Sequence, residues 1–158
     1  MPIQSKGQNK NNGENSYFYH FAIKYKEKFR TLIANELFME TLYSRIGSNG
    51  IKRLVDEFYN LIFNESTIAH LFKTGEESIR EKQYLFLTQF LGGPSLYSDV
   101  YGHPKMKMRH LPHAIGENEK DEWLRCMKLA IDKMDFDEIL KEELYYCFPR
   151  VAEHMRNK

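Results

Sequence analysis

The stretch Ile51-Lys-Arg-Leu-Val-Asp-Glu-Phe-Tyr-Asn-Leu-Ile62 decides the fold class of this chain. Its apolar residues recur at intervals of three and four positions, which is the period of an amphipathic α-helix with one buried face. The turn signal Gly47-Ser48-Asn49-Gly50 separates it from a shorter helical pattern that includes Leu42 and Ile46. No segment alternates convincingly with the period of two that a half-buried strand requires. The sequence therefore predicts an all-α protein.

Five more helical segments follow in the sequence. We expect them at about residues 67–72, 76–91, 105–110, 118–134 and 137–155. Gly92-Gly93-Pro94 ends the second of these, because glycine and proline together stop a helix. A loop-rich stretch from residue 95 to about residue 104 should follow. Pro149 should kink or interrupt the last helix.

Composition limits the class of protein. The chain has 158 residues, a formal net charge of +1 and an apolar fraction of 42%, which suit one globular domain that does not bind nucleic acid. Cys126 and Cys147 form no C-x-x-C or C-x-x-C-H motif, so zinc ribbons, thioredoxin-type sites and covalently attached haem find no support. No apolar run reaches membrane-spanning length, and residues 1–16 are polar. We therefore expect a cytoplasmic protein without a membrane partner.

Two parts are expected along the chain. Residues 1–35 form an N-terminal extension. Residues 1–15 are rich in Asn, Gln, Lys and Gly, cannot bury enough apolar surface to fold alone, and should be a disordered tail. Residues 17–34 carry loosely spaced aromatic residues that favour an extra helix. Residues 36–158 form the main domain.

Four residues carry the chemistry that the sequence suggests. His110 ends a basic, methionine-flanked segment just before Leu111-Pro112, where a neutral imidazole beside apolar residues can bind haem iron. Tyr59, Gln83 and Trp123 lie on apolar faces of three expected helices, and each needs a hydrogen-bond partner when buried. Taken singly, these three are better explained by core packing. Together with His110 they describe a two-sided pocket, with the histidine on iron and the donors facing a diatomic ligand.

Six motifs stand in order between residues 42 and 127. They are Leu42-Tyr-Ser-Arg-Ile-Gly47, Leu54-Val-Asp-Glu-Phe-Tyr59, Phe90-Leu-Gly-Gly-Pro-Ser-Leu-Tyr97, Gly102-His-Pro104, Met108-Arg-His-Leu-Pro112 and Trp123-Leu-Arg-Cys-Met127. In these motifs and their spacing the chain resembles the group II truncated haemoglobins. The resemblance implies that residues 36–158 are a truncated globin domain, a two-over-two helical sandwich that encloses haem b.

The resemblance also implies roles for particular residues. His110 matches the family's proximal iron ligand, Tyr59 its distal tyrosine and Trp123 the tryptophan that marks group II. Gln83 takes a distal position that holds Leu in some members and Gln in others. The other residues expected in the haem pocket are Phe72, Ile79, Phe86, Tyr97, Met106, Met108, Arg109, Leu111, Ile115 and Met127.

Some of these positions depart from the family pattern or carry charge. Ile79 stands where members usually have a small or short polar residue, so its branched side chain should narrow ligand access. His113 replaces a common phenylalanine, and should reach a haem propionate or lie exposed. Arg109 and Lys107 are candidate partners for the propionates, with simple solvation as the alternative.

Different functions are open at this point. The leading hypothesis is a haem protein, monomeric or homodimeric, that binds oxygen, nitric oxide or carbon monoxide at five-coordinate iron. Retention of oxygen by distal donors favours redox chemistry with oxygen, nitric oxide or peroxide, or sensing, over bulk transport. Turnover as a nitric oxide dioxygenase or peroxidase would need an unidentified reductase. The alternative is a cofactor-free helical interaction module. A zinc site at His103, His110 and His113 would lack cysteine or carboxylate ligands at suitable spacing.

Overall fold

The computed structural model describes residues 40–73 and 75–158. These residues form helices and no strand, which confirms the all-α fold class. All described helices belong to one compact unit, Thr41–Lys158. The tail and extra helix expected in residues 1–35 lie outside the described residues. No helix in the described part is both long and apolar enough to span a membrane.

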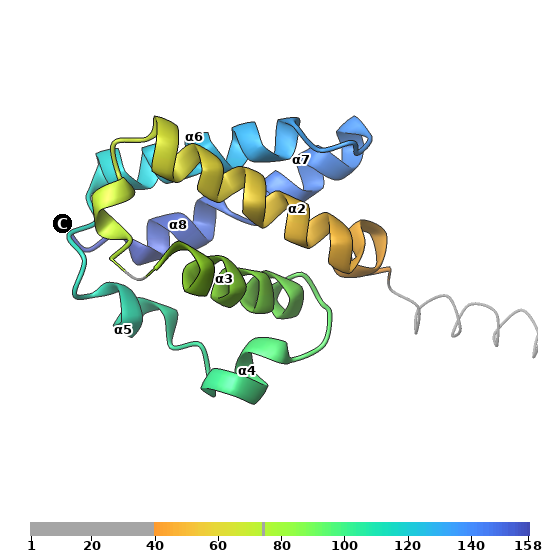
Figure 1. Ribbon diagram of the computed structural model, residues 1–158, viewed down its shortest axis with the longest axis horizontal. Coiled ribbons are helices and arrows are strands. Elements are labelled where there is room, and N and C mark those ends of the chain that lie inside the picture. Colours follow the sequence, from red (N-terminus) through yellow and green to blue (C-terminus); the bar gives the residue numbers. More distant parts are fainter. Residues whose placement is uncertain (1–39, 74) are drawn as a thin grey trace, which may run out of the picture. The chain divides into compact units, whose positions relative to one another are not determined.

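The first described helix, α2 (Leu42–Glu65), contains the stretch that decides the fold class (Figure 1). Its N-terminus is capped by Thr41, whose Oγ1 accepts a hydrogen bond from the Ser44 N–H at 3.1 Å. Gly47 interrupts the helix with a φ of 71° and a ψ of 164°, a conformation that glycine adopts without strain. The break expected between two helical patterns is therefore a kink at this glycine. The predicted apolar face beyond it is buried: Ile51, Leu54, Val55, Phe58, Tyr59 and Ile62.

A short 3₁₀ helix, η1 (Ala69–Leu71), leads to α3 (Glu76–Phe90), close to the expected boundaries. We expected a loop-rich stretch after α3. This expectation is wrong, since the stretch contains the helix α4 (Leu96–Tyr101). The Gln89 side chain accepts a hydrogen bond from the Ser98 N–H at 2.9 Å and donates one to the Ser98 hydroxyl at 2.8 Å. Tyr97, 4% exposed, packs on Phe86. These tertiary contacts hold a helix too short to be recognised by periodicity.

The remaining helices are α5 (Met106–His110), α6 (Glu117–Asp132), α7 (Glu138–Tyr146) and α8 (Pro149–Met155). Asp137 caps α7 by accepting a hydrogen bond from the Leu140 N–H at 2.9 Å. Pro149 occupies the first turn of α8, where its missing N–H costs nothing, so the predicted interruption of the last helix is confirmed.

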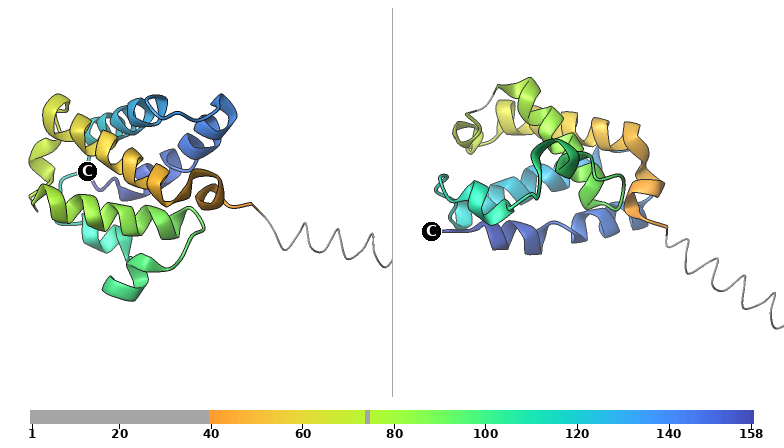
Figure 2. Two further views of the ribbon diagram at one scale, coloured as in Figure 1. Left: turned by 45° about the vertical axis from the view of Figure 1, so that its right-hand side comes forward. Right: turned by 90° about the horizontal axis from the view of Figure 1, so that it is seen from below.

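The main helices form two layers. α2 packs on α3 in one layer, and α6 packs on α7 and α8 in the other (Figures 1 and 2). α2 also packs on α6, which joins the two layers. The short helix α5 lies against α8. This two-over-two arrangement buries a core between α2 and α6 that includes Phe58, Ile62, Met127 and Ile131. It also places residues from α2, α3, α5, α6 and α8 around one cavity.

Candidate functional site

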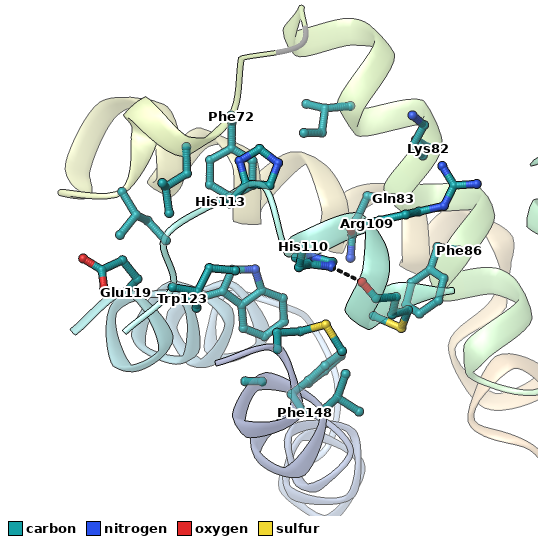
Figure 3. Close-up of a pocket in the computed structure, with 18 of the residues that line it drawn as sticks. Phe72, Lys82, Gln83, Phe86, Arg109, His110, His113, Glu119, Trp123 and Phe148 are labelled. Atoms are coloured by element: carbon teal, nitrogen blue, oxygen red, sulfur yellow. Dashed lines mark hydrogen bonds between the residues drawn. The ribbon is translucent and has the colours of Figure 1, made fainter. Parts of the chain in front are cut away.

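A cavity of about 460 Å³ opens between α2, α3, α5, α6 and α8. Its volume is typical of sites that hold a small molecule or cofactor. Most of the residues predicted from the sequence line it: Tyr59, Phe72, Ile79, Gln83, Phe86, Tyr97, Met106, Arg109, His110, Ile115 and Trp123. Figure 3 shows His110, Gln83, Phe72 and Trp123 around a common space, although they come from different helices or loops.

Three predicted pocket residues do not line the cavity. Met108 and Leu111 point away from it and are 64% and 58% exposed. On one turn of helix, residues one or two positions from His110 face other directions, whereas Met106, four positions away, shares its face. Met127 is fully buried in the core behind the cavity wall. We expected Met108, Leu111 and Met127 to line the haem pocket, but none of them lines this cavity.

His110 is oriented by its own helix. Its Nδ1 lies 2.7 Å from the Met106 carbonyl oxygen (Figure 3). A carbonyl only accepts hydrogen bonds, so we assign the ring proton to Nδ1, which leaves the lone pair on Nε2. An imidazole held this way is suited to bind a metal through Nε2. The described residues contain no cluster of three His, Cys, Asp or Glu that could hold an ion, so the zinc alternative gains no support.

Tyr59 is held among aromatic rings beside the cavity. Its ring stacks on Phe63 with a centroid separation of 5.7 Å, and meets the Phe72 ring edge-on at 5.7 Å. The Arg80 guanidinium lies 5.7 Å from the Tyr59 ring centroid. The Tyr59 hydroxyl makes no hydrogen bond to any described residue. Burial raises the pKa of Tyr59 although the Arg80 charge opposes the shift, so the hydroxyl, a donor at neutral pH like any tyrosine, stays protonated into the alkaline range.

Two further donors line the same cavity. Trp123 packs between Phe58 and Phe148, with ring centroids 5.2 Å and 5.7 Å away. Gln83 is half-buried on α3. Neither the Trp123 indole nor the Gln83 amide makes a hydrogen bond to a described residue. Donors from α2, α3 and α6 therefore remain available to a ligand in the cavity.

Arg109 and Lys82 line the cavity without carboxylate partners in the described part of the chain, whereas Lys120, which also lines it, pairs with Asp121 and Glu153. The Arg109 Nε donates to the Pro104 carbonyl at 3.0 Å, and its guanidinium lies 5.8 Å from the Tyr97 ring centroid. Lys82 lines the cavity as well, and sequence reasoning missed it. These cations suit a ligand that carries carboxylates. Lys107 does not line the cavity, because its ammonium donates to backbone carbonyls at the end of α8.

Sequence reasoning also missed one wall of the cavity. Phe148, Val151, Ala152 and Met155 line it from the last helix. Their spacing of i, i+3, i+4 and i+7 shows an apolar face in the sequence. Periodicity identifies such a face but not its partner, so only the packing of α8 on α5 and α6 assigns it to the cavity.

Comparison with known proteins decides the family. Residues 41–157 match a sequence family described as bacterial-like globin. A group 2 truncated haemoglobin of Bacillus subtilis (strain 168) is 37% identical over 116 residues, which are 73% of this chain and 88% of the relative. The chain belongs to the group II truncated haemoglobins. Another relative of this truncated haemoglobin, group 2 truncated haemoglobin 3-1 of Lotus japonicus, is 33% identical over 70% of this chain and 68% of its own length.

Solved structures agree with the two-over-two fold of this truncated haemoglobin. A truncated oxygen-avid haemoglobin from Bacillus subtilis matches with a TM-score of 0.71 and 36% identity, over 75% of this chain and 100% of that one. The group II truncated haemoglobin from Bacillus anthracis matches with a TM-score of 0.71 and 34% identity, over 75% and 92%. The truncated globin fold expected from the sequence is thereby confirmed.

Family membership makes this truncated haemoglobin a haem-based binder of small gaseous ligands rather than a cofactor-free module. The residues of its cavity fit haem. The walls are mainly aromatic and aliphatic, and Arg109 and Lys82 carry positive charges that suit propionates. The hydrogen bond of the His110 Nδ1 to the Met106 carbonyl leaves Nε2 of the neutral ring able to bind a metal. The unpartnered Tyr59 hydroxyl is the feature that an apolar cavity alone would not require.

Proposed function

We propose that this truncated haemoglobin binds haem b through His110 and retains oxygen by hydrogen bonding from Tyr59. Haem b is favoured because Cys126 and Cys147 form no attachment motif, so the cofactor is held without covalent bonds. When bound, haem supplies an iron atom with one position for the histidine and one for a diatomic gas. The proposed role of the protein is to hold, orient and shield that centre.

His110 is the proposed ligand because its ring cannot easily rotate. The hydrogen bond from Nδ1 to the Met106 carbonyl fixes the tautomer and raises the basicity of Nε2. Met106 itself lines the cavity from the same face of α5. The helix therefore supplies both the ligand and the group that orients it.

The observation that carries the proposal is the Tyr59 hydroxyl, which is protonated, lies in a buried side chain and lacks a described partner. A donor in this state gains about 0.5–1.5 kcal/mol when it meets an acceptor, which corresponds to up to about tenfold slower release. Trp123 and Gln83 are proposed as further donors. The oxygen-avid relative from Bacillus subtilis is consistent with retention by such donors.

Slow release suits some functions better than others. A protein that retains oxygen is poorly suited to bulk delivery, so we favour redox chemistry with oxygen, nitric oxide or peroxide, or sensing. Turnover as a nitric oxide dioxygenase or peroxidase requires an external reductase. Ile79 lines the cavity from α3 as a bulky branched side chain, and we propose that it slows ligand access.

The test is oxygen dissociation from the haem-reconstituted protein, measured by stopped-flow mixing. We expect Tyr59→Phe to accelerate dissociation by up to about tenfold, the factor set by one hydrogen bond. Tyr145→Phe is the matched control, because it removes the same hydroxyl group from a partly buried tyrosine that does not line the cavity. An unchanged rate in Tyr59→Phe would refute the role of Tyr59, and a wild-type protein without a Soret band would refute haem binding.

A further inference from the structure

The helix that carries the proposed iron ligand, α5, is too short to fix its position without contacts to other parts of the chain. α5 has only five residues, and Lys105, which precedes it, adopts a left-handed conformation with φ of 43°. Among the described residues, no side chain caps its N-terminus. A helix this short gains little from its own hydrogen bonds, so other parts of the chain must determine where His110 points.

The side chain of Asn157 contacts the backbone on both sides of the turn that follows α5. Its Nδ2 donates hydrogen bonds to the His110 carbonyl at 3.1 Å and to the His113 carbonyl at 2.9 Å. Its Oδ1 accepts a hydrogen bond from the Ile115 N–H at 3.1 Å. One side-chain amide therefore binds the backbone at three positions, His110, His113 and Ile115, in the segment that leads from α5 to α6.

The orientation of this amide is unambiguous. Nδ2 faces two carbonyl oxygens, which only accept, and Oδ1 faces an N–H group, which only donates. Rotating the amide by half a turn would replace three attractions with three repulsions. The Asn157 N–H also donates to the Ile115 carbonyl at 2.9 Å, so the backbone and the side chain of Asn157 bind the same segment.

A second connection joins α5 to the same end of the chain. The Lys107 Nζ donates to the His154 carbonyl at 2.8 Å and to the Arg156 carbonyl at 2.6 Å. These are orphan carbonyls at the C-terminal end of α8, where a cation is favourable. Residues 154–158 therefore contact α5 at Lys107 and the following turn at His110 and His113.

We propose that Asn157 is a positioning residue for the iron ligand His110, an inference that rests on the proposed function. The Met106 carbonyl sets the rotation of the imidazole ring, and Asn157 sets the position of the backbone that carries it. Loss of Asn157 frees the 110–115 turn, so the direction of Nε2 varies and the bond between imidazole and iron weakens. Asn157 touches neither haem nor gas in this role.

The test compares Asn157→Ala with Arg156→Ala in the haem-reconstituted full-length chain. Arg156 is the matched control, because Glu153 is the only partner of its side chain among the described residues. The Arg156 carbonyl, which accepts the hydrogen bond from Lys107, survives the substitution. We expect Asn157→Ala to transfer haem to apomyoglobin about fivefold to tenfold faster than wild type. We also expect its iron–histidine stretching band in resonance Raman spectra of the ferrous protein to shift or broaden. Arg156→Ala should match wild type in both measurements.

Asn157→Asp keeps the acceptor for the Ile115 N–H and loses both donors, so it should behave more like Asn157→Ala than like wild type. Thermal unfolding of the apo forms separates positioning from general stability. An Asn157→Ala or Asn157→Asp protein with a wild-type iron–histidine band and wild-type haem transfer would overturn the inference. A wild-type protein that fails to bind haem would instead overturn the proposed function.

Discussion

Tyr59 owes its chemistry to its surroundings. Its side chain is 2% exposed, and the Arg80 guanidinium stands over its ring. Arg80 is itself held by a hydrogen bond from Nη1 to the Asp56 carbonyl at 2.9 Å. Burial raises the pKa of Tyr59, and the Arg80 charge opposes this shift without reversing it. The folded protein therefore keeps this phenol protonated at pH values where an exposed tyrosine ionises.

The raised pKa of Tyr59 predicts a pH dependence of stability. Because the folded pKa lies above the unfolded value, the contribution of Tyr59 is fully present below about pH 10 and is lost as the pH rises toward the folded pKa. We expect the urea midpoint of the apo protein to fall more steeply above about pH 10 in wild type than in Tyr59→Phe. The other tyrosines ionise in both proteins, so parallel curves would contradict the prediction.

At the next scale, the turn after α3 determines how that helix meets the start of α2. The Tyr43 N–H donates to the Leu91 carbonyl at 2.9 Å, and the Gly93 N–H donates to the Thr88 carbonyl at 2.9 Å. A Cβ added at Gly93 would lie 2.6 Å from the Tyr43 Cγ and 2.7 Å from the Thr88 carbonyl oxygen. Glycine is required here by the close approach of the two segments.

Gly93→Ala should therefore lower the free energy of unfolding by about 1–3 kcal/mol, the usual cost of overpacking. Gly75→Ala is the control, because a Cβ at Gly75 would have nothing within 4 Å and its φ is −53°. Chemical denaturation of both apo variants measures the difference. Equal destabilisation of the two variants would show that the clash at Gly93 is relieved by small movements.

At the scale of the whole molecule, the haem cavity is lined by residues from α2, α3, α5, α6 and α8. A volume of about 460 Å³ lies between the helices, lined largely by aromatic and aliphatic side chains. Without the cofactor these side chains lack packing partners, so the apo protein should be markedly less stable. α5 should be the most affected helix, because it has only five residues and α8 is the main helix on which it packs.

Haem should thus raise the melting temperature of the wild-type protein. Linkage predicts a stabilisation of about 4 kcal/mol when the free ligand is at a thousand times its dissociation constant. His110→Ala should lose most of this gain and retain little haem. Circular dichroism melts of both proteins, with and without haem, provide the measurement. An equal rise in both proteins would place the principal attachment of haem on other residues.

Local pattern predicted much of the fold and part of the site. The helix through residues 51–62, the break at Gly47 and the interruption at Pro149 each depend on residues close together in sequence. The same holds for residue chemistry, because an imidazole or a phenol on an apolar face is visible without a structure. α4 escaped prediction because Gln89 and Tyr97 stabilise it through contacts outside its own six residues.

By itself, the sequence determined the helical class, the family and the set of side chains able to bind iron or a gas, because periodicity and residue type are local properties. The tertiary structure alone decided which of those side chains meet. In the folded chain Met108 and Leu111 are exposed, Met127 is buried in the core, and residues of α8 line the cavity. The tertiary structure also brought Asn157 to the His110 carbonyl, across 47 positions of chain. Such contacts depend on how helices pack, and no sequence window contains both partners.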